Sequence, residues 1–238
     1  MKNYHLTDAD KKQLLLGELF LRIARDFPGD VGCWSIYFMN YVTLQEGESM
    51  FLGPNIPHAY IYGGKSRSEV DRYFFFFFLL LGLLFIPYID CLECMACSDN
   101  VVRAGLTPKF KDIETLCSML DYQPGTVDRY RTKWNQVDEF CQVCTVPVPD
   151  FAMARVRLPA SSGPYNIPIC SSGSILLILQ GKAHFTDLGS FTFGKVIFLK
   201  ANEQLTVQTQ STEDVIIYQA FSNVKWSFTF FLWIWMNA

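Results

Sequence analysis

The first apolar pattern along the chain is helical. Near the N-terminus every third or fourth residue is apolar, namely Leu16, Phe20, Ile23 and Phe27. This is the spacing of one buried face of a helix. Thr7 and Asp10 are typical of a capped helix start, and the Pro-Gly-Asp turn at residues 28–30 ends the run. The sequence therefore predicts a short helical segment within residues 1–30.

After this helix the pattern changes to short apolar segments between turns, which is typical of a β protein. Residues 45–48 predict a turn, and residues 113–120 predict one short helix. The predicted strands are residues 49–52, 58–62, 91–100, 175–179 and 196–199. In the strand 91–100 the odd positions share one face, because side chains alternate between the two faces of a sheet.

Residues 64–89 follow neither period. They contain the apolar run from Phe74 to Ile86, which at 13 residues is shorter than the roughly 20 residues that span a bilayer. As a buried helix, this run would need a larger apolar host than the chain supplies. A third interpretation is a translated intron, because removing residues 64–89 joins Gly63 to Asp90 in a short turn between two predicted strands.

A short segment recurs in the two halves of the chain. The residues from Gly47 to Asn55 (GESMFLGPN) resemble those from Gly194 to Asn202 (GKVIFLKAN), and Leu205 stands at the position of His58. Such a match indicates two related β units, one in each half. Polar, proline-containing residues at 123–150 predict the boundary between them.

Composition limits the class of protein. Half of the 238 residues are hydrophobic and 18% are charged, which favours a folded core over disorder. A net charge of −3 argues against a nucleic-acid surface. The N-terminus has no apolar export signal, so we expect the eight cysteines to be reduced and the protein to be cytoplasmic.

Candidate chemistry centres on His58, one of three histidines. An imidazole on a short strand after a turn can bind a metal, although an ordinary core or surface histidine has the same signature. Polar residues accompany it on the predicted face or just downstream: Tyr60, Glu93, Asp99, Arg103 and Lys109. A cation pair beside a metal and a carboxylate could hold a phosphorylated small molecule while a proton moves. Alternatively, Arg103 and Lys109 are solvated loop charges.

Cysteine spacing offers a competing metal site. Cys91, Cys94 and Cys97 are three residues apart, as are Cys141 and Cys144, a spacing that suits structural zinc or iron–sulfur sites. On a strand Cys94 points away from Cys91 and Cys97, so these three cannot close on one metal without a loop. We therefore interpret the cysteines as small apolar residues.

Three motifs carry a family resemblance. Residues 57–60 (PHAY), 93–100 (ECMACSDN) and 102–109 (VRAGLTPK) resemble type I mannose-6-phosphate isomerase, also called phosphomannose isomerase. The similarity runs from about residue 10 to about residue 220, interrupted by residues 64–89. It implies a mainly β, cupin-like fold of jelly-roll (double-stranded β-helix) domains with a short N-terminal helical segment.

The resemblance also implies an organisation into domains. Residues 1–30 would end a helical domain, and residues 31–145 would form the C-terminal part of a cupin-type catalytic domain, with 64–89 as an atypical insertion. A smaller jelly-roll domain would occupy residues 146–221. An atypical aromatic tail would follow at 222–238.

The family is zinc-dependent and interconverts mannose 6-phosphate and fructose 6-phosphate in the cytoplasm for GDP-mannose synthesis. The resemblance implies that His58 is a zinc ligand and Arg103 the catalytic arginine. Four further residues would line the substrate pocket: Tyr60, Glu93, Asp99 and Lys109. We expect a monomer that binds a sugar phosphate, without nucleic-acid or membrane partners.

One departure from the family limits this expectation. Its other zinc ligands, a Gln-x-His pair and a glutamate, belong to an N-terminal region that is absent from this sequence. One ligand of four does not hold zinc tightly, so we expect an incomplete and inactive form. Two other functions stay open: a non-catalytic cupin-like binding module, and a membrane-associated variant that uses Phe74 to Ile86 and the apolar stretch from Trp226 to Met236.

Overall fold

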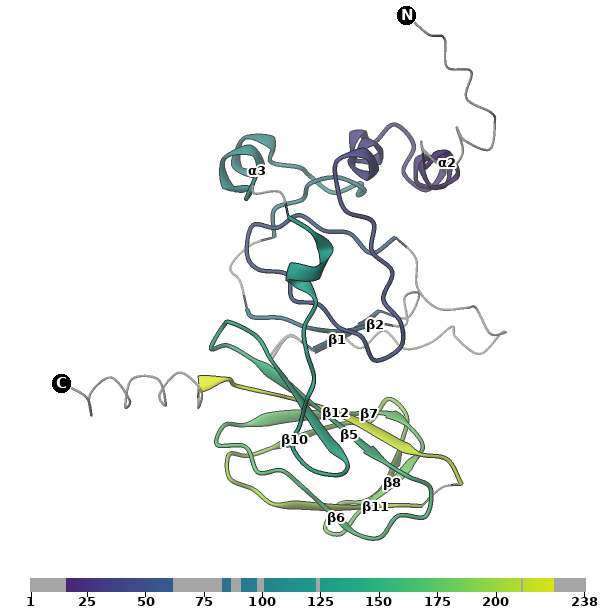
Figure 1. Cartoon of the computed structure of the whole chain (residues 1–238), viewed down its shortest axis with the longest axis vertical. Coiled ribbons are helices and arrows are strands. Elements are labelled where there is room, and N and C mark those ends of the chain that lie inside the picture. Colours follow the sequence, from purple (N-terminus) through teal and green to yellow (C-terminus); the bar gives the residue numbers. More distant parts are fainter. Residues whose placement is uncertain are drawn as a thin grey trace, which may run out of the picture. The chain divides into compact units, whose positions relative to one another are not determined.

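The structure is a computed structural model in which two compact units are distinguished (Figure 1). It describes residues 16–61, 83–86, 91–97, 101–122, 125–210 and 212–224. The first unit combines Met1–Lys65 with Ser98–Arg131, and the second combines Ser66–Cys97 with Thr132–Ala238. Segments far apart in the sequence thus fold together in each unit.

Helices and turns dominate the first unit. Its elements are α2 (Gly17–Asp26), the 3₁₀ helix η1 (Val31–Tyr37), α3 (Ile113–Met119) and the 3₁₀ helix η2 (Val127–Tyr130). The predicted N-terminal helix is confirmed over α2, which ends before Pro28 with Gly29 in the left-handed region (φ 77°). Its predicted start at Thr7 and Asp10 lies outside the described residues. The predicted helix 113–120 is confirmed as α3, where the side chain of Asp112 accepts a hydrogen bond from the Thr115 amide at 3.1 Å.

The core of the first unit is small. Its buried members are Ile23 of α2 with Cys33 and Ile36 of η1. Partly buried apolar residues pack around them: Leu16, Leu19, Phe20, Ala24, Phe27, Ile61 and Leu106. The apolar stripe predicted for the first helix therefore faces this core, because Ile23 is buried in it and Leu16, Phe20 and Phe27 pack against it.

Two predicted strands of the first unit are wrong. Within residues 49–52 only Met50 forms a bridge, antiparallel to Arg131, and residues 58–61 form no strand. Pro54 and Pro57 bracket the segment before His58, and proline has no amide hydrogen to donate to a sheet. The predicted turn at 45–48 is confirmed, since the Glu48 amide donates to the Gln45 carbonyl at 3.0 Å.

The stretch 64–89 includes a strand that the sequence did not predict. Strand β1 (Leu83–Ile86) pairs antiparallel with β2 (Cys91–Cys94), with Leu83 opposite Cys94. A short strand with apolar residues on both faces shows no alternation, which is why the pattern missed it. The predicted strand 91–100 is confirmed only to Cys94. Residues 62–82, 87–90 and 98–100 lie outside the described residues.

The second unit is a β sandwich. Its six-stranded sheet has the order β10-β7-β12-β5-β4-β3, and its four-stranded sheet has the order β6-β11-β8-β9. Neighbouring strands in both sheets are antiparallel. The strands are β3 (Asn135–Gln136), β4 (Cys141–Thr145), β5 (Ala152–Leu158), β6 (Tyr165–Ile167), β7 (Ser174–Gln180), β8 (Lys182–Phe185), β9 (Gly189–Thr192), β10 (Val196–Leu199), β11 (Leu205–Thr209) and β12 (Val215–Phe221).

Side chains from both sheets share one core. Val156 and Leu158 of β5, Ile217 of β12 and Phe185 of β8 are all fully buried in it. The predicted strands 175–179 and 196–199 are confirmed within β7 and β10. Strands β3 and β4 lie before residue 146 and are hydrogen-bonded into the same sheet as β5. The four predicted domains themselves stay a prediction.

The internal repeat extends to the backbone. Gly47 and Gly194 both have a left-handed φ, at 81° and 82°, and Asn55 and Asn202 also match, at 63° and 61°. Both copies therefore turn at the same two positions, as two related β units should. Only the second copy forms a full strand, β10, which pairs with β7.

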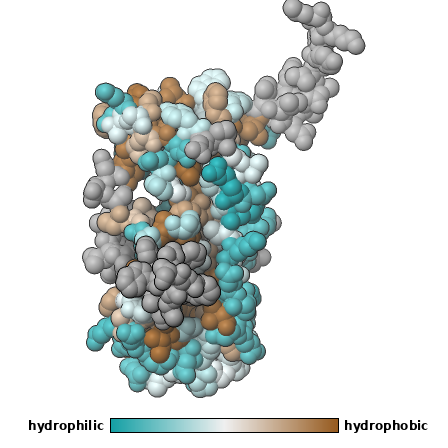
Figure 2. Space-filling model, turned by 60° about the vertical axis from the view of Figure 1, so that its left-hand side comes forward, coloured by the Kyte–Doolittle hydropathy of each residue, from teal (hydrophilic) through white to brown (hydrophobic). Residues whose placement is uncertain are grey.

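The small core leaves large apolar side chains of the first unit at the surface. Phe38 is 86% exposed and Trp34 57%; Figure 2 shows apolar patches between hydrophilic ones on the face it presents. In the part of the chain that the structure describes, no helix is long and apolar enough to cross a membrane. Residues 64–82 and the tail from 225 onward lie outside that part.

Gly181 gives a test of the second unit. It lies between β7 and β8 with φ 76°, where an added Cβ would lie 2.5 Å from the Asp214 carbonyl oxygen. We expect Gly181→Ala to lower the free energy of unfolding by about 3 kcal/mol, the cost of a left-handed alanine plus a backbone clash. Gly189→Ala is the matched control, since Gly189 has φ 91° and open space around it; it should cost only about 1 kcal/mol. Equal losses in urea unfolding would contradict the clash.

Candidate functional site

His58 and Tyr60 lie together on an extended segment of the first unit. Both side chains are exposed, and their rings meet edge to face with centroids 5.9 Å apart. The Nδ1 atom of His58 lies 3.0 Å from the Ile56 carbonyl oxygen. A carbonyl oxygen only accepts hydrogen bonds, so Nδ1 is the donor in this contact, and in the neutral ring Nε2 keeps its lone pair. This orientation is typical of a histidine that ligates a metal through Nε2.

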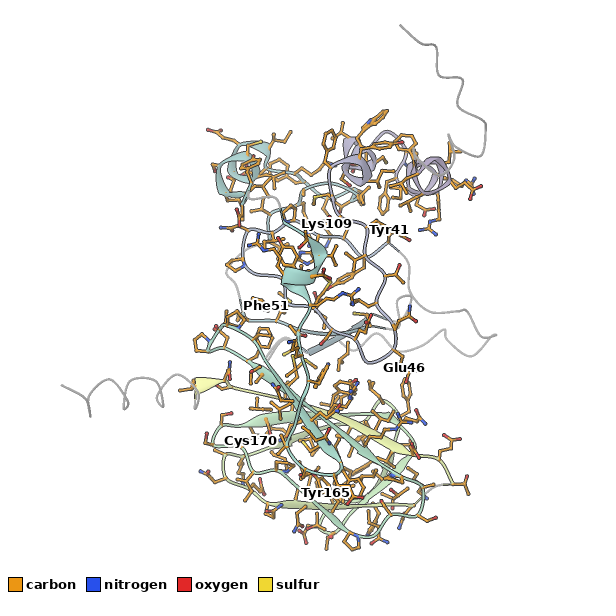
Figure 3. The ribbon with its side chains drawn as sticks, viewed as in Figure 1. Tyr41, Glu46, Phe51, Lys109, Tyr165 and Cys170 are labelled. Atoms are coloured by element: carbon orange, nitrogen blue, oxygen red, sulfur yellow. The ribbon has the colours of Figure 1, made fainter. Side chains whose placement is uncertain are left out.

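Arg103 and Lys109 lie at the two ends of a loop of the same unit. Arg103 is half-buried and Lys109 is exposed; Figure 3 labels Lys109. Within the described residues, neither cation forms an ion pair. The loop between them turns sharply, with Gly105 at φ 154° and Leu106 at φ 52°. Two cations on one loop suit an anionic ligand.

The small core brings these two segments together. Ile61 follows Tyr60 by one residue, and Leu106 is the central residue of the Arg103–Lys109 loop. Both side chains pack against the core formed by Ile23, Cys33 and Ile36. The structure thus joins the histidine segment and the cationic loop on one apolar support.

Asp30 fastens the loop to this support. Its side chain is only 8% exposed. Oδ1 accepts a hydrogen bond from the Gly32 amide at 2.7 Å, and Oδ2 accepts from the Thr107 amide at 3.3 Å and from Lys111 Nζ at 3.0 Å. One carboxylate therefore connects η1 with a loop about 80 residues further along the chain.

The surroundings of Asp30 decide its charge. Burial disfavours the ionised carboxylate, but hydrogen bonds from Gly32, Lys111, Thr107 and Leu106 together outweigh it and lower the pKa to about 2. Asp30 is therefore negatively charged at neutral pH and binds its donors as a charged acceptor.

The other two predicted pocket residues are placed differently. Glu93 lies half-buried on β2 in the second unit, and Asp99 lies outside the described residues. The structure therefore brings His58 together with Tyr60. It places Arg103 and Lys109 at the two ends of one loop. The roles assigned to these residues stay predictions.

The cysteines remain free thiols. Burial, with the charge of Glu93, raises the pKa of Cys91 and raises that of Cys94 to about 12. Burial, with Asp138, raises the pKa of Cys141 to about 11. Such thiols stay protonated at neutral pH in the absence of a metal. Cys141 and Cys144 are buried on β4, as small apolar residues would be.

The donors present fit zinc only in part. The ring of His58 is oriented as a ligand, but among the described residues no group of three His, Cys, Asp or Glu side chains could hold a metal ion. Four-coordinate zinc needs at least three protein ligands. The described donor set therefore does not form a zinc site around His58.

Comparison with known proteins identifies the chain's relatives. No protein-family model matches it. Mannose-6-phosphate isomerase from Homo sapiens is 38% identical over 213 residues, which cover 87% of this chain and 44% of that protein. A probable mannose-6-phosphate isomerase from Echinococcus multilocularis is 42% identical over 176 residues, 72% of this chain and 34% of that protein. The resemblance to mannose-6-phosphate isomerases is confirmed.

Solved structures agree on the fold. A point mutant of phosphomannose isomerase from Salmonella typhimurium matches with a TM-score of 0.63 at 23% identity, covering 90% of this chain and 49% of that one. The prediction of a mainly β, cupin-like fold with a short helical segment is thereby confirmed. The chain spans less than half the length of the mannose-6-phosphate isomerases it matches in sequence.

Sequence reasoning did not find the role of Asp30. In the sequence, the Pro-Gly-Asp turn at residues 28–30 indicates only the end of a helix. An aspartate before Gly32 signals a local cap, but nothing in the sequence links it to Thr107 or Lys111. That link depends on tertiary structure.

The charge of Asp30 gives a pH-dependent prediction. Its pKa is lower in the folded state than the ordinary value of 3.8, so its ionisation stabilises the fold above pH 4 and this contribution is lost as the pH falls towards 2. We expect Asp30→Asn to lower the free energy of unfolding of the first unit by about 1 kcal/mol at pH 7, discounted because Lys111 borders solvent. Urea unfolding followed by Trp34 fluorescence should show the difference shrinking between pH 4 and pH 2. A difference that is constant over this range would contradict the assignment.

Proposed function

We propose that this chain is part of a zinc-dependent mannose-6-phosphate isomerase and contributes the residues that hold the sugar phosphate. The observation that carries the proposal is that Ile61, which follows Tyr60, and Leu106, which lies between Arg103 and Lys109, pack against the same small core. The curated relatives at 38% and 42% identity are named mannose-6-phosphate isomerases. The names of these relatives suggest mannose 6-phosphate as the substrate. Arg103 and Lys109 are cations of the kind that binds such a phosphate.

The proposed reaction interconverts mannose 6-phosphate and fructose 6-phosphate. A proton moves between C1 and C2 through an enediol, and the carbonyl oxygen gains negative charge on the way. The guanidinium of Arg103 would donate hydrogen bonds to that oxygen where the charge develops. The ammonium of Lys109 would bind the phosphate as a point charge, and Tyr60 of the same unit would line the pocket; the substrate-binding roles of Glu93 and Asp99 rest on the family resemblance alone.

We propose His58 as one zinc ligand. We also propose that the 238 residues alone are an incomplete form of the enzyme. The Nε2 of His58 is available for a metal because Nδ1 contacts the Ile56 carbonyl. A single histidine binds zinc far more weakly than a four-ligand site. We also propose a cytoplasmic monomer whose sugar phosphate serves GDP-mannose supply, as in the family.

A non-catalytic cupin-like binding module is the second candidate. The second unit has a continuous core of its own, and Leu205, at the repeat position of His58, is 4% exposed within that core. A unit that needs no metal for its fold could serve binding alone. The membrane-associated alternative depends on segments that lie almost wholly outside the described residues.

Sugar-phosphate binding tests the role of the cationic loop. We expect the purified chain to bind mannose 6-phosphate with a Kd of about 1 mM, and both Arg103→Met and Lys109→Met to weaken binding about tenfold, since each removes a charge-assisted hydrogen bond. Isothermal titration calorimetry gives the Kd. Lys200→Met is the matched control, because Lys200 is an exposed lysine of the second unit. Equal affinity in all three variants would exclude the loop from the site.

Zinc binding tests the role of His58. We expect the dialysed chain to retain less than one zinc per chain, to bind added zinc with a Kd weaker than about 1 μM, and to show no isomerase activity. His58→Asn should weaken zinc binding further. His184→Asn is the control, because the His184 ring contacts Ser190 on the second unit. Stoichiometric zinc with isomerase turnover by the 238 residues would refute the incomplete form.

A further inference from the structure

The loop between Arg103 and Lys109 needs an external restraint. Leu106 has φ 52°, a left-handed conformation that costs free energy for any residue other than glycine. Such a bend persists only where surrounding contacts determine it. The amide that follows the bend faces Asp30, since Thr107 N donates to its carboxylate at 3.3 Å.

The backbone of the loop packs directly against the backbone at Gly32. An added Cβ on Gly32 would lie 2.8 Å from the Leu106 nitrogen and 2.9 Å from Gly105 Cα. An added Cβ on Gly105 would lie 2.8 Å from Gly32 Cα. The two glycines therefore let the backbones touch beside Asp30, which places its carboxylate within reach of the loop amides.

The restraint extends towards both cations. Lys111 donates to Asp30 and also to the Thr107 carbonyl at 3.2 Å. The hydroxyl of Thr107 in turn accepts from the Lys109 amide at 3.2 Å. Arg103 lies three residues before the bend at Leu106. One largely buried carboxylate thus holds the backbone between the two cationic residues, at Thr107.

Asp30 does more than cap a helix. Asp112 is an ordinary cap in the same unit: its carboxylate is hydrogen-bonded by the amide and hydroxyl of Thr115, three residues away. Asp30 accepts from Gly32 in the same local way, but its second oxygen serves Thr107 and Lys111, 77 and 81 residues away. Capping η1 does not require those distant donors.

We propose that Asp30 is a positioning residue that holds residues 105–107 so that Arg103 and Lys109 are presented together to the phosphorylated sugar. The proposal rests on the function proposed above. Asp30 does not touch the substrate in this role. It acts through the loop backbone, and Lys111 acts with it as the second arm of the restraint.

The test compares Asp30→Asn with Asp112→Asn in the full chain. We expect Asp30→Asn to speed amide hydrogen exchange at residues 105–107 about tenfold and to weaken mannose 6-phosphate binding about tenfold, the effect of one lost charged hydrogen bond. Exchange in β5, β7 and β12 should stay unchanged, which shows that the second unit is intact. Asp112→Asn should change neither the loop exchange nor the Kd by more than about twofold.

A double-mutant cycle separates positioning from a general loss of structure. If Asp30 acts through Arg103, Asp30→Asn should weaken binding by less than about threefold in the Arg103→Met background. An unchanged Kd in Asp30→Asn, with the Arg103→Met effect intact, overturns the positioning role and leaves the proposed function standing. Full additivity of the two substitutions also overturns it. If the unmodified chain binds no mannose 6-phosphate, the proposed function fails and the positioning role fails with it.

Discussion

Three buried side chains, Ile23, Cys33 and Ile36, are the apolar centre on which the first unit depends. Each fully buried aliphatic side chain contributes only about 2 kcal/mol, so a core of this size stabilises little chain. Yet the histidine segment and the cationic loop are both attached to it, through Ile61 and Leu106. A polar connection is therefore needed beside the apolar one, and the Asp30 carboxylate provides it at low solvent exposure.

The second unit shows the opposite balance. Two antiparallel sheets enclose a core that draws side chains from eight of their strands. The Asp214 carboxylate, which accepts a hydrogen bond from the distant Arg157, is more exposed than that of Asp30. The nine-residue repeat, residues 47–55 and 194–202, folds differently in the two units. The same pair of left-handed turns flanks a fully paired strand, β10, in one unit and a single bridge at Met50 in the other. The sequence determines the two turns. Whether the residues between them form a strand depends on a neighbouring strand to pair with, which is β7 for β10.

This difference explains how far the sequence could predict the structure. The apolar stripe of α2, the helix α3 and two strands of the sandwich, β7 and β10, follow local patterns, and those predictions are confirmed. The strand expected at residues 58–62 depended on a neighbour that local pattern cannot supply, and Pro57 removed a donor as well. Strand β1 was missed because a short run that is apolar on both faces has no period to detect. Asp30 and Lys111 are 81 residues apart, beyond any local rule.

The candidate site follows the same physical division. The orientation of His58 is local, because the Ile56 carbonyl two residues away sets which ring nitrogen can bind a metal. The placement of Arg103 and Lys109 is tertiary, because their loop is bent against its own preference at Leu106 and held by a distant carboxylate. A metal site demands still more, since three or more donors must converge within fractions of an ångström. One well-oriented histidine is therefore not a metal site by itself, while the loop shows how tertiary contacts hold the backbone between two cationic residues.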